Sequence, residues 1–287
     1  MRVALATSSE FPDLDLDDTP LVAALEQRGL EPVPLVWDDP QSDWAAAPIC
    51  LIRSTWDYFD RRDEFVAWAE RTGGVTDLWN PAEVIRWNSD KRYLRDLEDR
   101  GVPTVPTLWI EPGSTVDIAH ELDVRAWGDA IVKPAIDGGA RRLMRVEATG
   151  AGAAQDHADT LLAGGGAVLV QPFLPSVASD GELSLVFVDD NLTHAVRKQP
   201  ADQDFRVQPE WGGTSTRVDP GADELRAAEA VMAALELPTL YARVDLVRDD
   251  GGALRLIELE VIEPRLFFTD APEAAEALAD AIAARLA

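Results

Sequence analysis

The sequence predicts an α/β protein that turns to α+β in its C-terminal half. Within the first 80 residues, short apolar runs alternate with helical patterns, which is typical of a small domain built on a parallel sheet. Farther along, strands follow one another through tight turns, and the chain closes with a β-hairpin and a helix. At 287 residues the chain is long enough for about two domains.

In the N-terminal part, Thr19 fits a helix N-cap because Pro20 follows it in the first turn. We place a domain boundary near Asn80-Pro81. It separates an α/β domain over residues 1–84 from a second unit over residues 85–287. The elements expected before the boundary are strands at 3–7, 31–37 and 49–53 and helices at 19–28 and 61–72.

Beyond the boundary, Asn88 fits the N-cap of a helix over residues 89–100. Segment 199–213 is predicted to be a long loop, and loops of this length are often functional. The other expected elements are strands near 104–110, 130–134, 143–146, 167–171, 182–189 and 191–197, helices at 155–163, 223–235 and 271–286, and a hairpin over 241–261.

The charge balance argues against two classes of partner. The chain carries 26 basic and 52 acidic residues, a formal net charge of −26. Phosphates require clustered Lys and Arg, so nucleic acid and anionic membranes are disfavoured.

The single cysteine, Cys50, lies in an apolar run and is predicted to be a buried strand thiol. No apolar run approaches a membrane span and the first residues do not resemble a signal peptide, so we expect a cytoplasmic protein.

Lysine is scarce, since Lys91, Lys133 and Lys198 are the only three and arginine supplies the other basic residues. An ammonium is a compact charge that fits between phosphate oxygens, whereas a guanidinium is a planar fork. Lys133 ends an apolar strand and precedes the turn Asp137-Gly138-Gly139-Ala140. The backbone N–H groups of such a turn could cradle a triphosphate. Codon bias with chance is the alternative explanation of the count.

The last hairpin carries the clearest chemical signal. If its strands pair symmetrically about a turn at 249–252, Arg243 opposes Glu258 and Asp245 opposes Leu256. Side chains of cross-strand partners, and of residues two apart on one strand, share a face. The resulting acidic face holds Asp245, Glu258 and Glu260, opposite an apolar face of Val244, Leu246, Ile257, Leu259 and Val261.

Three carboxylates on one face would repel one another and need a cation. Ligation by oxygen alone suits Mg²⁺, or alternatively Mn²⁺, and Mg²⁺ held by a few carboxylates normally also takes substrate phosphates. The competing interpretation is a solvated face with an Arg243–Glu258 ion pair, which would contribute little to stability.

Together these features resemble the ATP-grasp superfamily over roughly residues 85–287. The segment Asp204-Phe-Arg206-Val-Gln-Pro-Glu-Trp-Gly212-Gly213 is similar to the arginine-containing loop of glutathione synthetase and RimK-type ligases. The cycloserine-synthetase-like branch is the closer resemblance, on Arg53-Ser-Thr-Trp-Asp-Tyr58, Trp87-Asn-Ser-Asp-Lys91 and Glu258-Leu-Glu-Val-Ile-Glu-Pro264. It implies an ATP-grasp fold preceded by a small Rossmann-like domain, with a lid-like subdomain at about 104–170 and a catalytic subdomain at about 171–287.

The resemblance also implies roles for individual residues. Two departures accompany it: most such ligases have Glu-x-Asn where this chain has Glu258-x-Glu260, and the glycine turn is short and carries Asp137. Arg265 could instead pair with Glu263, and Arg53 could instead hold the domain interface. Lys198 could likewise be a salt-bridged strand end. The implied catalytic residues are Arg206, Lys198 and Arg265; the ATP-binding residues are Lys91, Lys133, Gly138, Gly139, Gln171, Pro172, Phe173, Leu174 and Glu182; the metal ligands are Asp245, Glu258 and Glu260; and the substrate-binding residues are Arg53, Asp57, Gly212 and Gly213.

The implied activity is an ATP- and Mg²⁺-dependent carboxylate–amine ligase that works through an acyl phosphate on a small amino-acid-like substrate. Ring closure, as in cycloserine formation from O-ureido-D-serine, is one form of this reaction, and a dipeptide-type ligase of a biosynthetic cluster is another. A small-molecule kinase is the alternative from a different class. A homodimer or homotetramer is the assembly typical of such enzymes.

Overall fold

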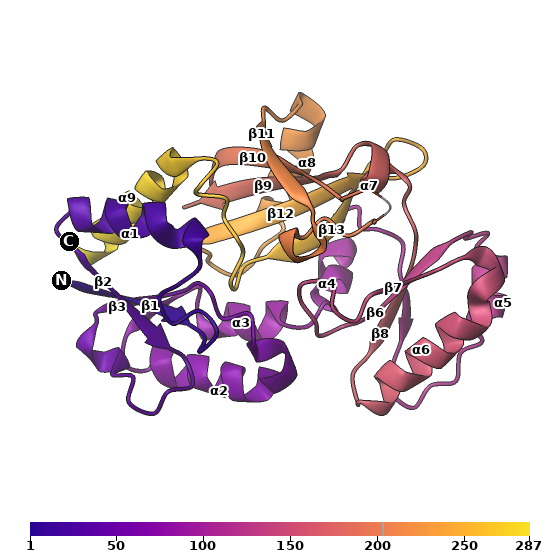
Figure 1. Cartoon of the computed structure of the whole chain (residues 1–287), viewed down its shortest axis with the longest axis horizontal. Helices are drawn as coiled ribbons and strands as arrows, with labels where there is room; N and C mark the ends of the chain where they lie inside the picture. The colour runs from indigo at the N-terminus through magenta and orange to yellow at the C-terminus, as the bar shows by residue number, and fades with distance from the viewer. Residues whose placement is uncertain (203) are drawn as a thin grey trace.

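The N-terminal part forms a parallel four-stranded sheet with the order β2-β1-β3-β4 (Figure 1). The computed structural model describes residues 1–202 and 204–287, so Gln203 of the loop predicted over 199–213 lies outside the described residues. The prediction of a parallel sheet is confirmed, although the short strand β4 was not predicted. The elements are β1 (Arg2–Thr7), α1 (Thr19–Gln27), β2 (Glu31–Val36), β3 (Ile49–Ile52), α2 (Arg62–Gly73) and β4 (Asp77–Trp79).

The start of α1 differs from the prediction. Thr19 is the first helical residue, and Asp18 occupies the N-cap position without a side-chain capping bond. The Asp18 carboxylate instead accepts hydrogen bonds from Arg53 Nε at 2.7 Å and Ser54 Oγ at 3.1 Å. A buried ion pair therefore replaces the capping interaction that the sequence suggested for Thr19.

A single helix over 89–100 was also a wrong prediction. Two short helices, α3 (Ala82–Asn88) and α4 (Tyr93–Asp99), occupy this region, and Asn88 is the last residue of α3 rather than an N-cap. The Asn88 amide donates to Leu259 O at 2.9 Å and accepts from Val261 N at 3.2 Å. Its side chain therefore pairs with a distant strand, not with its own helix.

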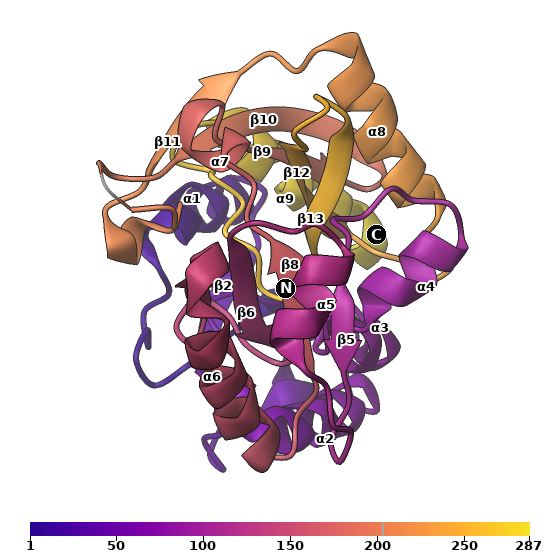
Figure 2. The same cartoon turned by 90° about the vertical axis from the view of Figure 1, so that its right-hand side faces the viewer.

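The middle of the chain forms an antiparallel sheet with the order β5-β8-β6-β7. Figure 2 shows α5 (Ile118–Val124) and α6 (Ala151–Ala163) against this sheet, where they share a small apolar core with it. The strand predicted at 104–110 is shorter, and Thr104 forms only an isolated bridge to Leu256. The strands are β5 (Leu108–Ile110), β6 (Ala130–Pro134), β7 (Met144–Val146) and β8 (Val168–Pro172), so the predicted subdomain boundary near 170 falls inside β8.

The third sheet has the order β11-β10-β9-β12-β13, with every neighbouring pair antiparallel. One apolar core joins it to the N-terminal domain, because α1 and α9 lie side by side against it (Figure 1). In the described part of the chain, no helix is long and apolar enough to cross a membrane. The elements are α7 (Ser176–Ser179), β9 (Glu182–Val188), β10 (Asn191–Gln199), β11 (Thr214–Val218), α8 (Ala222–Ala233), β12 (Tyr241–Arg248), β13 (Leu254–Glu260) and α9 (Pro272–Leu286).

Candidate active site

The β12–β13 hairpin brings the three predicted acids together, although by a different register. Asp245 opposes Glu258 and Arg243 opposes Glu260, and a bulge separates Asp245 from Leu246. The turn shifts the pairing by one residue from the predicted register, and the bulge shifts it by one more. Because the side-chain period of a strand is two, a total shift of two residues leaves the acids on the predicted face.

The bulge changes the apolar face. Leu246 pairs with Leu256, which is buried, whereas Ile257 packs into a separate small cluster near Val105 and Val207. The prediction that Ile257 faces the main core was therefore wrong, and Leu256 takes that place.

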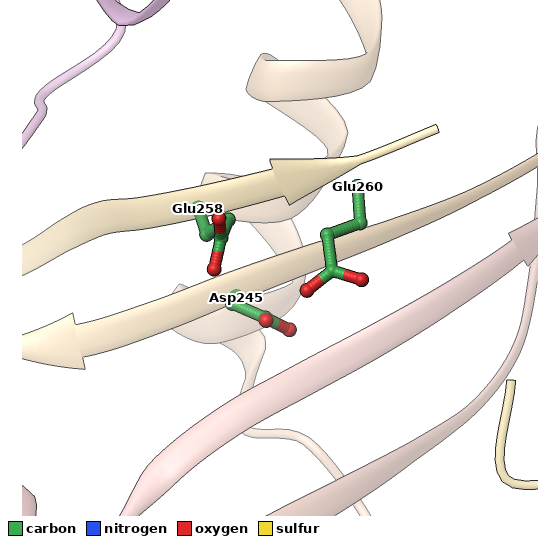
Figure 3. Close-up of side chains that lie close together, drawn as sticks. All are labelled: Asp245, Glu258 and Glu260. Carbon is green, nitrogen blue, oxygen red and sulfur yellow. The ribbon is translucent and has the colours of Figure 1, made fainter. Parts of the chain in front are cut away.

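The carboxylates of Asp245, Glu258 and Glu260 point toward one another (Figure 3). One oxygen from each lies within 4.8 Å of the others. Asp245 is fully buried, while Glu258 and Glu260 keep 30% and 29% of their side chains exposed. Three oxygen donors at this spacing, two of them reachable from solvent, fit a hard divalent cation such as Mg²⁺.

Asp245 is already fully hydrogen-bonded by protein groups. Its Oδ1 accepts from Ser184 Oγ at 2.6 Å and Arg243 Nε at 3.0 Å, and its Oδ2 accepts from Lys198 Nζ and Arg243 Nη2, each at 2.9 Å. Burial raises the pKa of Asp245, but Arg243 and Lys198 outweigh burial and hold the pKa well below its usual range. These contacts use all the lone-pair positions of a carboxylate. A metal ligand at Asp245 would therefore have to displace one donor.

Arg243 is a site residue that the sequence interpretation undervalued. It pairs with Asp245 and, across the strands, with Glu260, so the Arg243–Glu258 ion pair of the competing interpretation does not form. Burial raises the pKa of Glu260 to about 7 despite this partner. The sequence did carry a signal, because Arg243 stands two residues before Asp245 and must share its face.

Lys198 on β10 bridges two carboxylates. Its ammonium contacts Asp245 and Glu182, and all three side chains are at most 10% exposed. Burial raises the pKa of Glu182 to about 7, against the attraction of Lys198. Lys198 is thus a salt-bridged strand end, as the alternative interpretation had it, and it is also part of the acidic cluster.

Lys91 joins the acids to the glycine turn. Its Nζ lies 3.0 Å from Glu258 Oε1 and donates to the backbone oxygen of Asp137 at 2.7 Å. Burial raises the pKa of Glu258, but Lys91 and Lys133 outweigh it and lower that pKa. The Asp137 carboxylate, which could repel phosphates, accepts from Arg142 instead, with 3.1 Å between Oδ2 and the Arg142 backbone N.

Lys133 is the one lysine whose ammonium has no hydrogen bond or ion pair within the described residues. It projects from β6 and is 9% exposed. Burial lowers the pKa of Lys133 to about 8, which Glu258 only partly offsets. An uncompensated buried ammonium costs free energy, and an anionic ligand would remove that cost.

The predicted ATP-binding segment at residues 171–174 spans the end of β8. Gln171 is buried and donates to Thr107 Oγ1 at 2.9 Å. Pro172 ends the strand opposite Ala130, and Leu174 is buried in a small cluster. The Phe173 ring lies 3.7 Å from the Arg145 guanidinium and 6.0 Å from the Phe205 ring.

Arg206 lies in the long loop and is not in contact with the acidic cluster in this structure. Its guanidinium pairs with Asp204 at 2.7 Å and stacks 3.4 Å from the Trp211 ring centroid. Gly212 has a φ of +82°, and a side chain at Gly213 would overlap the carbonyl of Val207. Both glycines thus shape the loop backbone.

The predicted substrate residues make protein contacts. Arg53 is buried, with Nε on Asp18 and Nη2 3.2 Å from Pro264 O, which are contacts of the domain-interface alternative. Asp57 accepts from Trp37 Nε1 at 2.9 Å. Arg265 pairs with Asp15 at 3.3 Å and not with Glu263, the partner in the alternative interpretation.

Comparisons with known proteins agree along the whole chain. Residues 3–80 match the family described as D-cycloserine synthetase DcsG, N-terminal domain. The chain is 34% identical to the cycloserine biosynthesis protein DcsG of Streptomyces lavendulae over 296 residues, which cover 99% of this chain and 98% of that protein. The crystal structure of D-cycloserine synthetase DcsG matches with a TM-score of 0.89 and 33% identity, over 100% of both chains. D-alanine–D-alanine ligase from Bacillus anthracis, solved with ATP, shares the fold at 16% identity and a TM-score of 0.73, over 99% of this chain and 96% of that one.

Proposed function

This chain belongs to the DcsG family of ATP-grasp ligases, and from that premise we propose that it closes the ring of a cycloserine-type product. As an ATP-grasp ligase it spends ATP to join a carboxylate to an amine-type nitrogen. In the proposed reaction both groups belong to one small amino-acid derivative, for which O-ureido-D-serine is the test compound. The observation that carries the proposal is the cluster of Asp245, Glu258 and Glu260 beside Lys91 in a chain that matches DcsG end to end.

We propose that Glu258 and Glu260 hold Mg²⁺, with Asp245 as a third ligand or as the anchor of the cationic residues around them. Their oxygen-only donor set and partial exposure support this assignment. When bound, Mg²⁺ neutralises phosphate charge during phosphoryl transfer. Mn²⁺ is the alternative ion for the same donor set.

The residues of this chain would divide the remaining work by charge. Lys133 would bind the triphosphate, since its ammonium is buried without an anionic partner of its own, and Lys91 would join it through the glycine turn at Gly138 and Gly139. Residues 171–174 would hold the adenine. Glu182 would bind the ribose while its ion pair with Lys198 holds the carboxylate in place.

Two arginines would act where the phosphoryl group and the substrate carboxylate react. Arg206 would stabilise charge on the phosphoryl group and on the tetrahedral oxyanion once the 199–213 loop folds inward. Arg265 would fork onto a substrate carboxylate by exchanging its Asp15 partner. Arg53, Asp57, Gly212 and Gly213 would shape the substrate side, Arg53 through the domain interface. The nitrogen then attacks the acyl carbon of the acyl phosphate, the acyl–phosphate bond breaks, and inorganic phosphate leaves. Because the attacking nitrogen of O-ureido-D-serine carries a carbamoyl group, water must also cleave that group, which leaves as carbon dioxide and ammonia.

The test combines phosphate release with detection of product by mass spectrometry. The protein with ATP, Mg²⁺ and O-ureido-D-serine should yield cycloserine and inorganic phosphate, and Glu258→Gln should abolish both. Glu229→Gln, an exposed change on α8, is the matched control and should turn over at the parent rate. Phosphate release by the parent that yields a stable phosphorylated compound would indicate a kinase and overturn the proposal.

A further inference from the structure

The glycine turn is held from the N-terminal domain by Phe59. We call residues 137–142 the glycine loop. A side chain added at Gly138 would overlap the ring of Phe59, and its three nearest atoms all belong to that ring. The φ of Gly138 is not in the left-handed region, so its backbone would accept other residues. The Phe59 ring is therefore the nearest obstacle to a side chain there.

Trp211, in the 199–213 loop, makes a second contact with the glycine loop. Its Nε1 donates to the carbonyl oxygen of Gly139 at 3.0 Å. The Trp211 ring also carries the Arg206 guanidinium at 3.4 Å from its centroid. The position of the proposed catalytic arginine is thus linked through one indole ring to the glycine loop.

Phe59 rests on a rigid base. Its ring lies 4.3 Å from Tyr58, which stacks on Phe65 at 4.5 Å, and Phe65 stacks on Trp68 at 5.0 Å. These partners are buried in the core of the N-terminal sheet. An aromatic column of this kind fixes the ring that meets Gly138.

Two arginines of the glycine loop reinforce the contact. The Arg141 guanidinium lies 5.5 Å from the Phe59 ring centroid, and Arg142 lies 3.8 Å from Asp60. Both arginines are exposed, so these contacts are weak individually. They show that the loop touches the N-terminal domain along its length and not at one atom.

We propose that Phe59 and Trp211 are positioning residues that clasp the glycine loop and keep water from the activated carboxylate. The inference rests on the proposed function. If the clasp opens, water attacks the acyl carbon, the acyl–phosphate bond breaks, phosphate leaves, and the original carboxylate is regenerated. ATP is then consumed without product. Because Phe59 belongs to the N-terminal domain, the coupling of ATP use to ligation depends on that domain.

The direct test counts phosphate released per molecule of product. The ratio should be near one for the parent and rise several-fold in Phe59→Leu and in Trp211→Phe, which removes the N–H donor and replaces the indole with a smaller aromatic ring. Phe59→Tyr keeps the ring and should restore the parent ratio. Trp79→Leu is the matched control, because Trp79 is a half-buried aromatic of the same domain that contacts Arg285 and lies outside the aromatic column.

A double-mutant cycle isolates the contact itself. Gly138→Ala should weaken MgATP binding in the parent, because the new Cβ overlaps Phe59. The same change in the Phe59→Leu background should weaken binding less, since the ring is gone. Equal losses in both backgrounds would show that Phe59 does not define the loop position.

Proteolysis gives a readout that needs no substrate. Trypsin cleavage after Arg141 and Arg142, followed by mass spectrometry, should be several-fold faster in Phe59→Leu and Trp211→Phe than in the parent or in Trp79→Leu. Parent-like cleavage in both variants would overturn the clasp, and faster cleavage with an unchanged phosphate ratio would overturn its coupling role. If the parent makes no cycloserine, the proposed function fails while the cleavage rates still decide the clasp.

Discussion

Nucleotide affinity should fall as the pH rises above about 8, because the buried ammonium of Lys133 loses its proton in that range. The triphosphate is a fixed anion there, since its last ionisation lies near pH 6. A protonated Lys133 attracts it and a neutral Lys133 does not. Binding itself should keep Lys133 charged, because a phosphate next to an ammonium favours the charged form.

The magnitude follows from the pKa. With a pKa of about 8 in the free protein and Lys133 charged in the complex, the apparent Kd scales with 1 + 10^(pH − 8). It therefore rises about tenfold from pH 7 to pH 9, equivalent to about 1.4 kcal/mol of binding free energy. In the absence of nucleotide, Lys133 has a pKa of about 10.5 in the unfolded chain and about 8 in the folded protein. Burying the charged Lys133 therefore lowers the free energy of unfolding below pH 8, and this loss is relieved as the pH rises from 8 toward 10.5.

Calorimetric titration with MgATP at pH 7, 8 and 9 measures this dependence. Lys133→Arg is the matched control, because a guanidinium stays charged over the whole range. It should bind MgATP more weakly than the parent at pH 7, and its Kd should rise much less between pH 7 and pH 9 than the parent's Kd. A flat Kd in the parent, or the same slope in both proteins, would refute the assignment of the titration to Lys133.

Two further changes test the supports of the site. Arg243→Leu should lower the free energy of unfolding by about 3–5 kcal/mol at pH 8, because it leaves buried carboxylates unpaired. The loss should be smaller at pH 6, since Glu260, with a pKa of about 7, takes up a proton there; equal losses in urea denaturation at the two pH values would contradict this. Asn80→Ala should cost about 3 kcal/mol or more, because the Asn80 amide donates to Tyr241 O and Val261 O and accepts from Leu240 N. Thermal unfolding followed by tryptophan fluorescence measures that loss. A variant as stable as the parent would show that the three Asn80 hydrogen bonds do not stabilise the fold.

Local pattern was enough to predict most strands and the acidic face. Strand β6 has the predicted bounds because an apolar run ends at Pro134, and the acids share a face because that rule depends only on whether an offset is even or odd. The bulge beside Asp245 leaves no mark in a run of apolar and acidic residues. The true cross-strand pairs were therefore out of reach.

The connections between distant segments could not be predicted. Asn80 and Asn88 each bond to backbone groups more than 150 residues away along the chain. An asparagine before a helical pattern is equally typical of a helix cap, and only tertiary packing decides between the two uses. The contact of Phe59 with Gly138 belongs to the same class, because neither residue carries a polar signal that points to the other.

The burial of every lysine has a practical consequence for chemical labelling. Lys133 and Lys198 are 9% and 7% exposed, and the Lys91 side chain is 12% exposed. Acylating reagents such as succinimide esters will therefore meet an arginine surface that they cannot modify, and any side-chain amine that reacts must have been uncovered by an opening of the structure around these lysines. The native chain thus contains its own footprinting probe, with no engineered tag.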